Sequence, residues 1–178
     1  MKSAVQTIPL KSPPTSTLVM CAALAIIPIG DFVIMMRIAP QMVGLHVFLN
    51  GGILALIVFI IVSIRKTRFE ISEKGLRIRG DMFGQFFSWV DLDVANAKRI
   101  SFDAEPGLKP KWRTCGVGLP GYGSGWFRLH NKSKALIFLS NKNEAIYLPT
   151  RKDFSLLLSS ADDTALLNAL KEHGELSK

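Results

Sequence analysis

Asp31, His46 and Asn50 are polar side chains that lie in otherwise apolar stretches. If residues 18–36 and 44–64 form two helices that fold back on each other, these three side chains lie at similar depth. An ionisable group inside a membrane-spanning helix is costly and usually has a partner. One interpretation is a proton or ion relay, or a contact with another membrane protein. The other is a structural clasp near the outer surface, which we favour because two helices cannot enclose a conduction path.

The glycine-rich segment 113–129, RTCGVGLPGYGSGWFRL, is the second candidate site. A phosphate-binding loop needs a following helix, but an aromatic strand follows here instead. Tyr122 and Trp126 are of the residue types that dominate binding energy at interfaces, and Arg113 and Arg128 flank them. These four residues therefore form a candidate partner-binding surface. The alternative is that the aromatic side chains fill the mouth of the domain while the glycines permit a sharp bend.

The remaining reactive residue types do not fall into a catalytic pattern. His46, His130 and His173 lack metal-ligand spacing, and Ser124 in Gly-Ser-Gly lacks the strand–turn–helix context of a hydrolase nucleophile. We therefore expect no enzyme activity, no metal and no cofactor. The net charge is +8 and the pI about 9.7, but no zinc pattern or RNA-binding aromatic motif accompanies this charge. We expect no nucleic-acid partner.

Two long apolar stretches predict the elements that position the polar cluster. Residues 44–64 contain no Lys, Arg, Asp or Glu, and about 20 apolar residues suffice to cross a bilayer. Residues 18–36 are too long for a typical signal-peptide core and lack a small-residue cleavage site, so we expect a first span there. The chain is then an integral membrane protein with two spans, preceded by a flexible tail at residues 1–17.

The distribution of basic residues predicts the orientation. Lys2 and Lys11 precede the first span, and Arg65 and Lys66 follow the second, whereas the short turn holds only Arg37. Lys and Arg accumulate on the cytoplasmic side of membrane proteins. We therefore expect both termini to be cytoplasmic and the protein to lie in the cell (inner) membrane.

Residues 67–173 form the part of the chain that we expect outside the bilayer. Alternating apolar residues on either side of Gly75 predict a β-hairpin, and later runs bring the total to about seven or eight short strands. An apolar stripe that includes Leu166 and Leu170 predicts a closing helix, capped by Ser160 and ending near Gly174. The expected fold is α+β, with a transmembrane helical hairpin followed by a small, partly open β-barrel and a C-terminal capping helix.

Several stretches resemble the bacterial PH (pleckstrin-homology-like) domains of small membrane proteins: KGLRIRG (74–80), SWVDL (88–92), the segment 113–129, AIYLPT (145–150) and LSSADDTALLNAL (158–170). The resemblance covers roughly residues 67–172, and its most specific part is the Gly-Leu-Pro-Gly-Tyr turn with Gly-Trp-Phe after it. Asp163-Thr164 departs from the aspartate-proline pair often seen there. The resemblance implies a PH-like fold attached to a membrane, and it implies no defined reaction.

Two classes of function remain open. The first is a membrane-anchored interaction module that binds a protein partner or a second copy of itself at the cytoplasmic face. The second is a sensor of anionic lipid headgroups or another ligand, for which cations outside the spans provide the motivation. These cations are Lys109, Lys111, Arg113, Arg151 and Lys152. Because they are scattered along the chain, we favour the interaction module.

Overall fold

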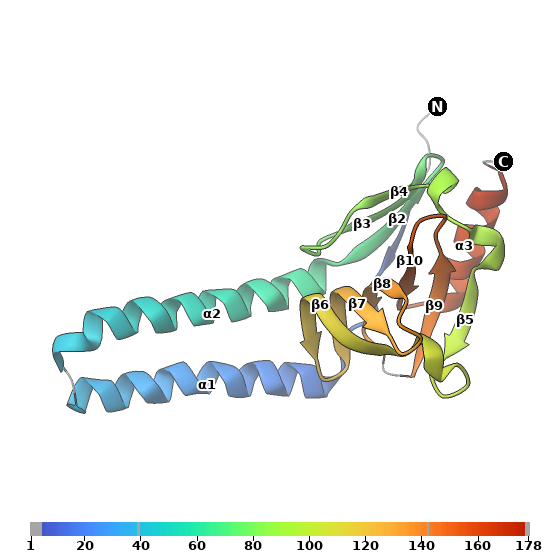
Figure 1. Ribbon diagram of the computed structural model, residues 1–178. Coiled ribbons are helices and arrows are strands. Elements are labelled where there is room, and N and C mark those ends of the chain that lie inside the picture. The colour runs from blue at the N-terminus through green and yellow to red at the C-terminus, as the bar shows by residue number, and fades with distance from the viewer. Residues whose placement is uncertain (1–4, 39, 142, 177–178) are drawn as a thin grey trace.

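Two long antiparallel helices project from a β-rich domain in the computed structural model, which describes residues 5–38, 40–141 and 143–176 (Figure 1). Helix α1 (Thr15–Ile38) and helix α2 (Val43–Lys66) are joined through a 3₁₀ turn (Pro40–Met42). Within the 18-residue apolar stretch of each helix, only 12% of α1 and 6% of α2 is buried within the protein. Core helices of a soluble domain would be mostly covered. Both helices are long and apolar enough to cross a membrane, where lipid would cover these faces.

The first sheet is antiparallel, with strand order β1-β2-β3-β4. Strands β2 (Arg68–Ser72) and β3 (Gly75–Arg79) confirm the predicted hairpin, and β4 (Phe86–Ser88) pairs with β3. Strand β1 (Gln6–Pro9) pairs with β2, with Ile8 opposite Phe69. Strand β1 lies in residues 1–17, which were predicted to be a flexible tail. The structure differs because Ile8 and Leu10 are buried in the domain core.

The second sheet has the order β5-β9-β10-β8-β7-β6. Its strands are β5 (Lys98–Ser101), β6 (Pro110–Leu119), β7 (Tyr122–Leu129), β8 (Lys134–Leu139), β9 (Glu144–Pro149) and β10 (Phe154–Leu158). All neighbours are antiparallel except β8 and β10, which run parallel. The β6–β7 hairpin forms one edge, and its turn reaches the start of α1, where the Thr17 hydroxyl donates to the Pro120 carbonyl oxygen at 2.5 Å.

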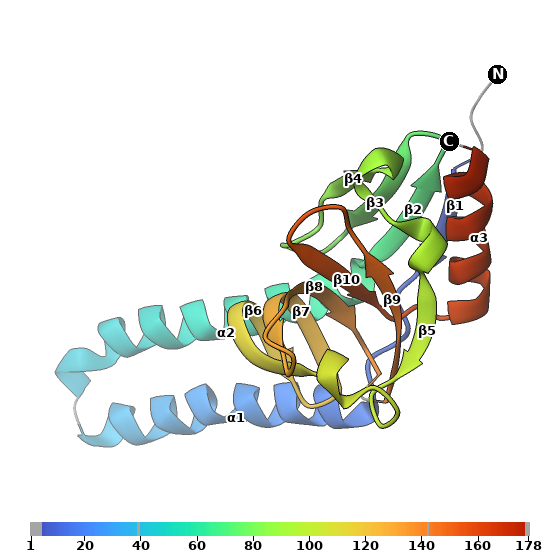
Figure 2. The ribbon, with the colours of Figure 1, turned by 45° about the vertical axis from the view of Figure 1, so that its right-hand side comes forward.

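Helix α3 (Asp163–Leu176) closes the core between the sheets. It packs against β2 and β3 of the first sheet and against β5 and β9 of the second (Figure 2). Leu166 and Leu170 are fully buried there, in the same cluster as Trp89. The predicted α+β class is confirmed, with two long apolar helices, sheets and a C-terminal helix. Over the described residues the sheets remain two separate ladders rather than one closed barrel.

Trp89 is buried in a 3₁₀ turn after β4, where its indole N–H donates to the Ser72 carbonyl oxygen at 3.0 Å. Two predictions about α3 were wrong in detail. The cap of α3 is Asp162, whose carboxylate accepts from the Ala165 backbone N–H at 2.9 Å, whereas Ser160 donates to Asp163. Gly174 lies inside α3 instead of ending it. A Cβ there would come within 2.8 Å of Val94, so the glycine permits close packing.

Candidate functional site

Trp126 and Arg128 of β7 share one face of the second sheet, because side chains two residues apart on a strand point the same way. On the neighbouring strand, Leu136 lies opposite Trp126 and Lys134 lies opposite Arg128. Phe154, the first residue of β10, pairs in turn with Lys134. Three strands therefore bring two cations and two aromatic rings together at one place on the sheet.

These residues line a groove of about 370 Å³. We name it the β7 groove and define it by its lining residues: Thr114, Trp126, Phe127, Arg128, Lys134, Asp153 and Phe154. The rings of Trp126 and Phe154 meet edge to face, with centroids 5.0 Å apart, and the centroid of the Phe87 ring of β4 lies 6.2 Å from that of Phe154. Trp126 is half-buried, so its ring supports the fold and still contributes apolar surface to the groove.

The charges around the β7 groove are unbalanced in favour of cations. Arg128 and Lys134 are both exposed and directly opposite each other on adjacent antiparallel strands, an arrangement in which like charges repel. Neither belongs to an ion pair among the described residues, and Arg128 donates only to the Lys132 carbonyl oxygen, at 3.1 Å. Asp153 is the one acidic residue in the lining. An anionic group bound between the two cations would relieve their repulsion.

Tyr122 does not belong to this groove. Its side chain is 4% exposed, and its hydroxyl donates to Asp81 Oδ2 at 3.0 Å. Burial and the neighbouring Asp81 carboxylate both raise the pKa of the Tyr122 phenol, so it stays protonated and remains a donor. Tyr122 is therefore not available as a surface contact. For this residue the structure supports the alternative in which the aromatic side chain fills the domain interior.

Arg113 is also separated from Trp126 and Arg128. It pairs with Phe127 across the β6–β7 ladder, and Phe127 belongs to the cluster on the other face of the sheet. A side chain at Gly118 would lie 3.5 Å from the Arg113 guanidinium, on that same face. The structure thus brings together two of the four predicted partner-binding residues.

Five lining residues were not among the four that were predicted from sequence: Thr114, Phe127, Lys134, Asp153 and Phe154. Lys134 and Phe154 meet only through the parallel pairing of β8 with β10, and parallel neighbours are not joined by a short turn that a sequence could reveal. The sequence did indicate a strand beginning at Phe154, because an apolar run starts there. It did not indicate which residues of β8 this strand would pair with.

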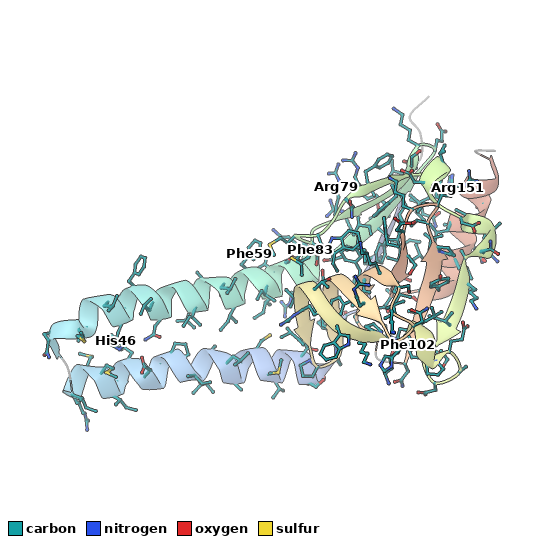
Figure 3. All side chains as sticks on the ribbon, in the orientation of Figure 1. His46, Phe59, Arg79, Phe83, Phe102 and Arg151 are labelled. Carbon is teal, nitrogen blue, oxygen red and sulfur yellow. The ribbon has the colours of Figure 1, made fainter. Side chains whose placement is uncertain are left out.

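The predicted polar cluster on the two apolar helices is only partly assembled. The Asn50 side-chain amide donates to Asp31 Oδ2 at 3.2 Å, across the two helices. His46 instead contacts the 3₁₀ turn just before its own helix, with its Nδ1 3.1 Å from the Met42 carbonyl oxygen. Figure 3 shows His46 near the end of the hairpin that is remote from the domain.

The cations that motivated a lipid sensor do not form one cluster. Lys152 pairs with Asp91 at 3.0 Å, and Arg151 lies on the side of the domain away from the helices (Figure 3). Lys111 and Arg113 lie near the start of β6, at the opposite end of the strand from the turn that contacts α1.

The described residues contain no group of three or more His, Cys, Asp or Glu side chains arranged to hold a metal ion. A family model described as bacterial PH domain matches residues 67–174, which span β2 to α3. No curated protein and no solved structure matches the chain.

Proposed function

Because the chain belongs to the bacterial PH domain family, we propose that it is a membrane-anchored interaction module. In this proposal α1 and α2 anchor the domain in the cell membrane, with both termini in the cytoplasm. The β7 groove binds an acidic segment that also presents an apolar side chain, supplied by a protein partner or by a second copy of this chain. Catalysis has no part in the proposal.

One observation carries the proposal: two opposed cations, which have no ion-pair partner among the described residues, line an open groove together with two aromatic rings. A carboxylate placed between Arg128 and Lys134 would gain two charge-assisted hydrogen bonds, and Trp126 would bury an adjacent apolar side chain. Trp and Arg are the residue types most enriched among those that dominate interface energetics. The basic residues that flank the helices support the orientation, because they favour the cytoplasmic side.

Reversing the charge of Arg128 tests the groove. A photoreactive amino acid at Thr114, an exposed lining residue, should crosslink the full-length protein in its native membrane to a protein segment. Arg128→Glu should lower that yield by about tenfold, since losing one such contact costs at least about 1.4 kcal/mol of binding free energy. Arg128 is exposed, so the variant should keep its thermal unfolding midpoint.

The matched control is Lys171→Glu, which makes the same charge change at an exposed position of α3. Its crosslinking yield should equal that of the wild type. Equal yields in Arg128→Glu and Lys171→Glu would show that the groove does not bind through its cations. An adduct with the mass of a phospholipid, lost in Arg128→Glu, would support the anionic-lipid sensor instead.

We propose that Asp31 and Asn50 form a structural clasp. Asp31→Asn keeps an oxygen that can accept from the Asn50 amide, so the thermal unfolding midpoint in detergent should stay close to that of the wild type. Asp31→Leu removes the acceptor and should cost about 0.6–2 kcal/mol, the range of hydrogen bonds between membrane helices. If Asp31→Asn destabilises the protein as much as Asp31→Leu, the charge itself is required, and the clasp interpretation fails.

A further inference from the structure

A small apolar pocket lies where α2 meets the domain. Its walls include Leu56, Phe59 and Ile60 of α2, Met82 and Phe83 of the β3–β4 loop, and Val117 of β6. Figure 3 shows Phe59 and Phe83 close to each other at this junction. The pocket has a volume of about 90 Å³. It is separate from the β7 groove, with which it shares no lining residue.

Hydrogen bonds and a close backbone contact hold the walls in place. The Ser63 hydroxyl of α2 donates to the Gly80 carbonyl oxygen at 3.0 Å. Gly80 has a φ of +88°, and a Cβ there would clash with the Lys66 backbone, so only glycine allows this approach. Asp81 accepts from the Tyr122 hydroxyl at 3.0 Å and from the Phe83 backbone N–H at 2.8 Å. The β3–β4 loop is thus fixed against α2, and the pocket is preformed.

The position of the pocket along α2 determines what surrounds it. Gly80 contacts the backbone at Lys66, so the end of the pocket formed by Asp81 and Tyr122 lies level with the charged end of the helix. The α2 lining of the pocket begins at Ile64, two residues before Lys66, and ends at Leu56, about 12 Å deeper along the helix axis at about 1.5 Å per residue. This depth belongs to the apolar part of the span, so the pocket faces the headgroup boundary at one end and hydrocarbon at the other.

Two exposed features of the junction fit the same surroundings. Met82, at the tip of the loop, is 65% exposed. Its apolar side chain would gain no stabilisation in water, but at the bilayer boundary lipid would cover it and remove its surface from water. Arg65 and Lys66 are exposed at the end of α2, next to the polar end of the pocket, where phosphate groups of lipids lie.

The Ser124 hydroxyl adds a polar group to the lining. Ser124 is 1% exposed, and its oxygen makes no direct hydrogen bond among the described residues, although it lies near enough to the Tyr122 hydroxyl to oppose the rise in the pKa of that phenol. A buried hydroxyl without a partner is costly, so an acceptor on the occupant would stabilise it. The junction therefore combines cations at the end of α2 with a pocket that has one buried hydroxyl group and an apolar wall.

We propose that this pocket holds part of one acyl chain of a bilayer phospholipid. The ester carbonyl would accept from Ser124, and the first methylene groups would lie along Ile60, Phe59 and Val117. A volume equal to about three water molecules, at roughly 30 Å³ each, admits a short length of one chain and excludes a headgroup. Apolar cavities stay dry and take up apolar molecules, and hydrocarbon is the one fluid in contact with the deep end. A bound chain fixes the height of the domain above the membrane.

The test uses the full-length protein in vesicles of phosphatidylethanolamine and phosphatidylglycerol, with a trace of phospholipid that carries a diazirine near the ester end of one acyl chain. After illumination, mass spectrometry should find label on residues 80–85 of the loop as well as on α2. Val117→Phe fills the pocket from β6 and should abolish the loop label, while label on the lipid-facing Phe48 remains. Val90→Phe makes the same change at a 70% exposed site outside the pocket and should leave the loop label unchanged.

A second blocking variant keeps the test valid if Val117→Phe does not fold. Phe59→Trp enlarges a side chain on the helical wall, where the α2 backbone is not disturbed, and it should abolish the loop label in the same way. Wild-type protein with no label on residues 80–85 would overturn the proposal. Loop label that persists in both blocking variants would do so too, because the label would then come from passing lipid and not from a chain held in the pocket.

Discussion

Replacing Leu166 by Asp is expected to unfold the domain. Leu166 is fully buried between α3 and the sheets, in the cluster that contains Trp89 and Leu170. A carboxylate there has no cation near enough to pair with among the apolar residues of this cluster. Burying an unpaired charge costs several kcal/mol, against a total stability of about 5–15 kcal/mol for a typical domain. The variant should lose its cooperative thermal transition, which circular dichroism of the detergent-solubilised protein would measure.

Asn168→Asp provides the control, because it introduces the same charged group at an exposed position two residues further along α3. Its transition midpoint should stay near that of the wild type. If Leu166→Asp also melts at the wild-type temperature, α3 does not close the core, and the arrangement of the two sheets around it is incorrect.

Replacing Ile8 by Lys should destabilise the domain by several kcal/mol. Ile8 lies in β1, pairs with Phe69 and is only 6% exposed. The substitution removes apolar burial from the core and forces a cation toward it, and both changes act against folding. The neighbouring Thr7 points to the other face, is exposed and lies opposite Glu70, so Thr7→Lys should change stability by less than about 0.5 kcal/mol.

Limited proteolysis of the two variants in detergent measures this difference. Cleavage within residues 67–174 should be much faster in Ile8→Lys than in Thr7→Lys or the wild type. Equal resistance of all three proteins would mean that β1 contributes nothing to the domain, and that the segment before α1 is the flexible tail expected from its sequence.

The two apolar helices and the β2–β3 hairpin were predictable because their signals are local. Hydropathy over residues 44–64 and alternation on either side of Gly75 need no knowledge of the rest of the chain. Strand β1 was not predictable in this way. Its residues, Gln6–Pro9, show no strong alternation, and they become a strand because β2 offers an open edge and the core offers space for Ile8.

The candidate site was predicted in part for a related reason. Segment 113–129 was identified from glycine and aromatic content, but content alone does not say which of its side chains the rest of the fold buries. Tyr122 and Trp126 differ by four residues and share a face, yet Tyr122 lies inward at the junction with Asp81, whereas Trp126 lies at the open side of the sheet. Lys134 and Phe154 come together only because β8 and β10 pair in parallel, and this pairing is a property of the tertiary fold.

The most direct test of the account is the side of the membrane on which the domain lies. Cys115 is exposed on β6, and the other cysteine, Cys21, is buried in α1. A membrane-impermeant maleimide should therefore leave the protein unlabelled in intact cells and label it after lysis, and Cys115→Ser should remove that label. Labelling of Cys115 in intact cells would place the domain outside the cytoplasm and contradict a cytoplasmic interaction module.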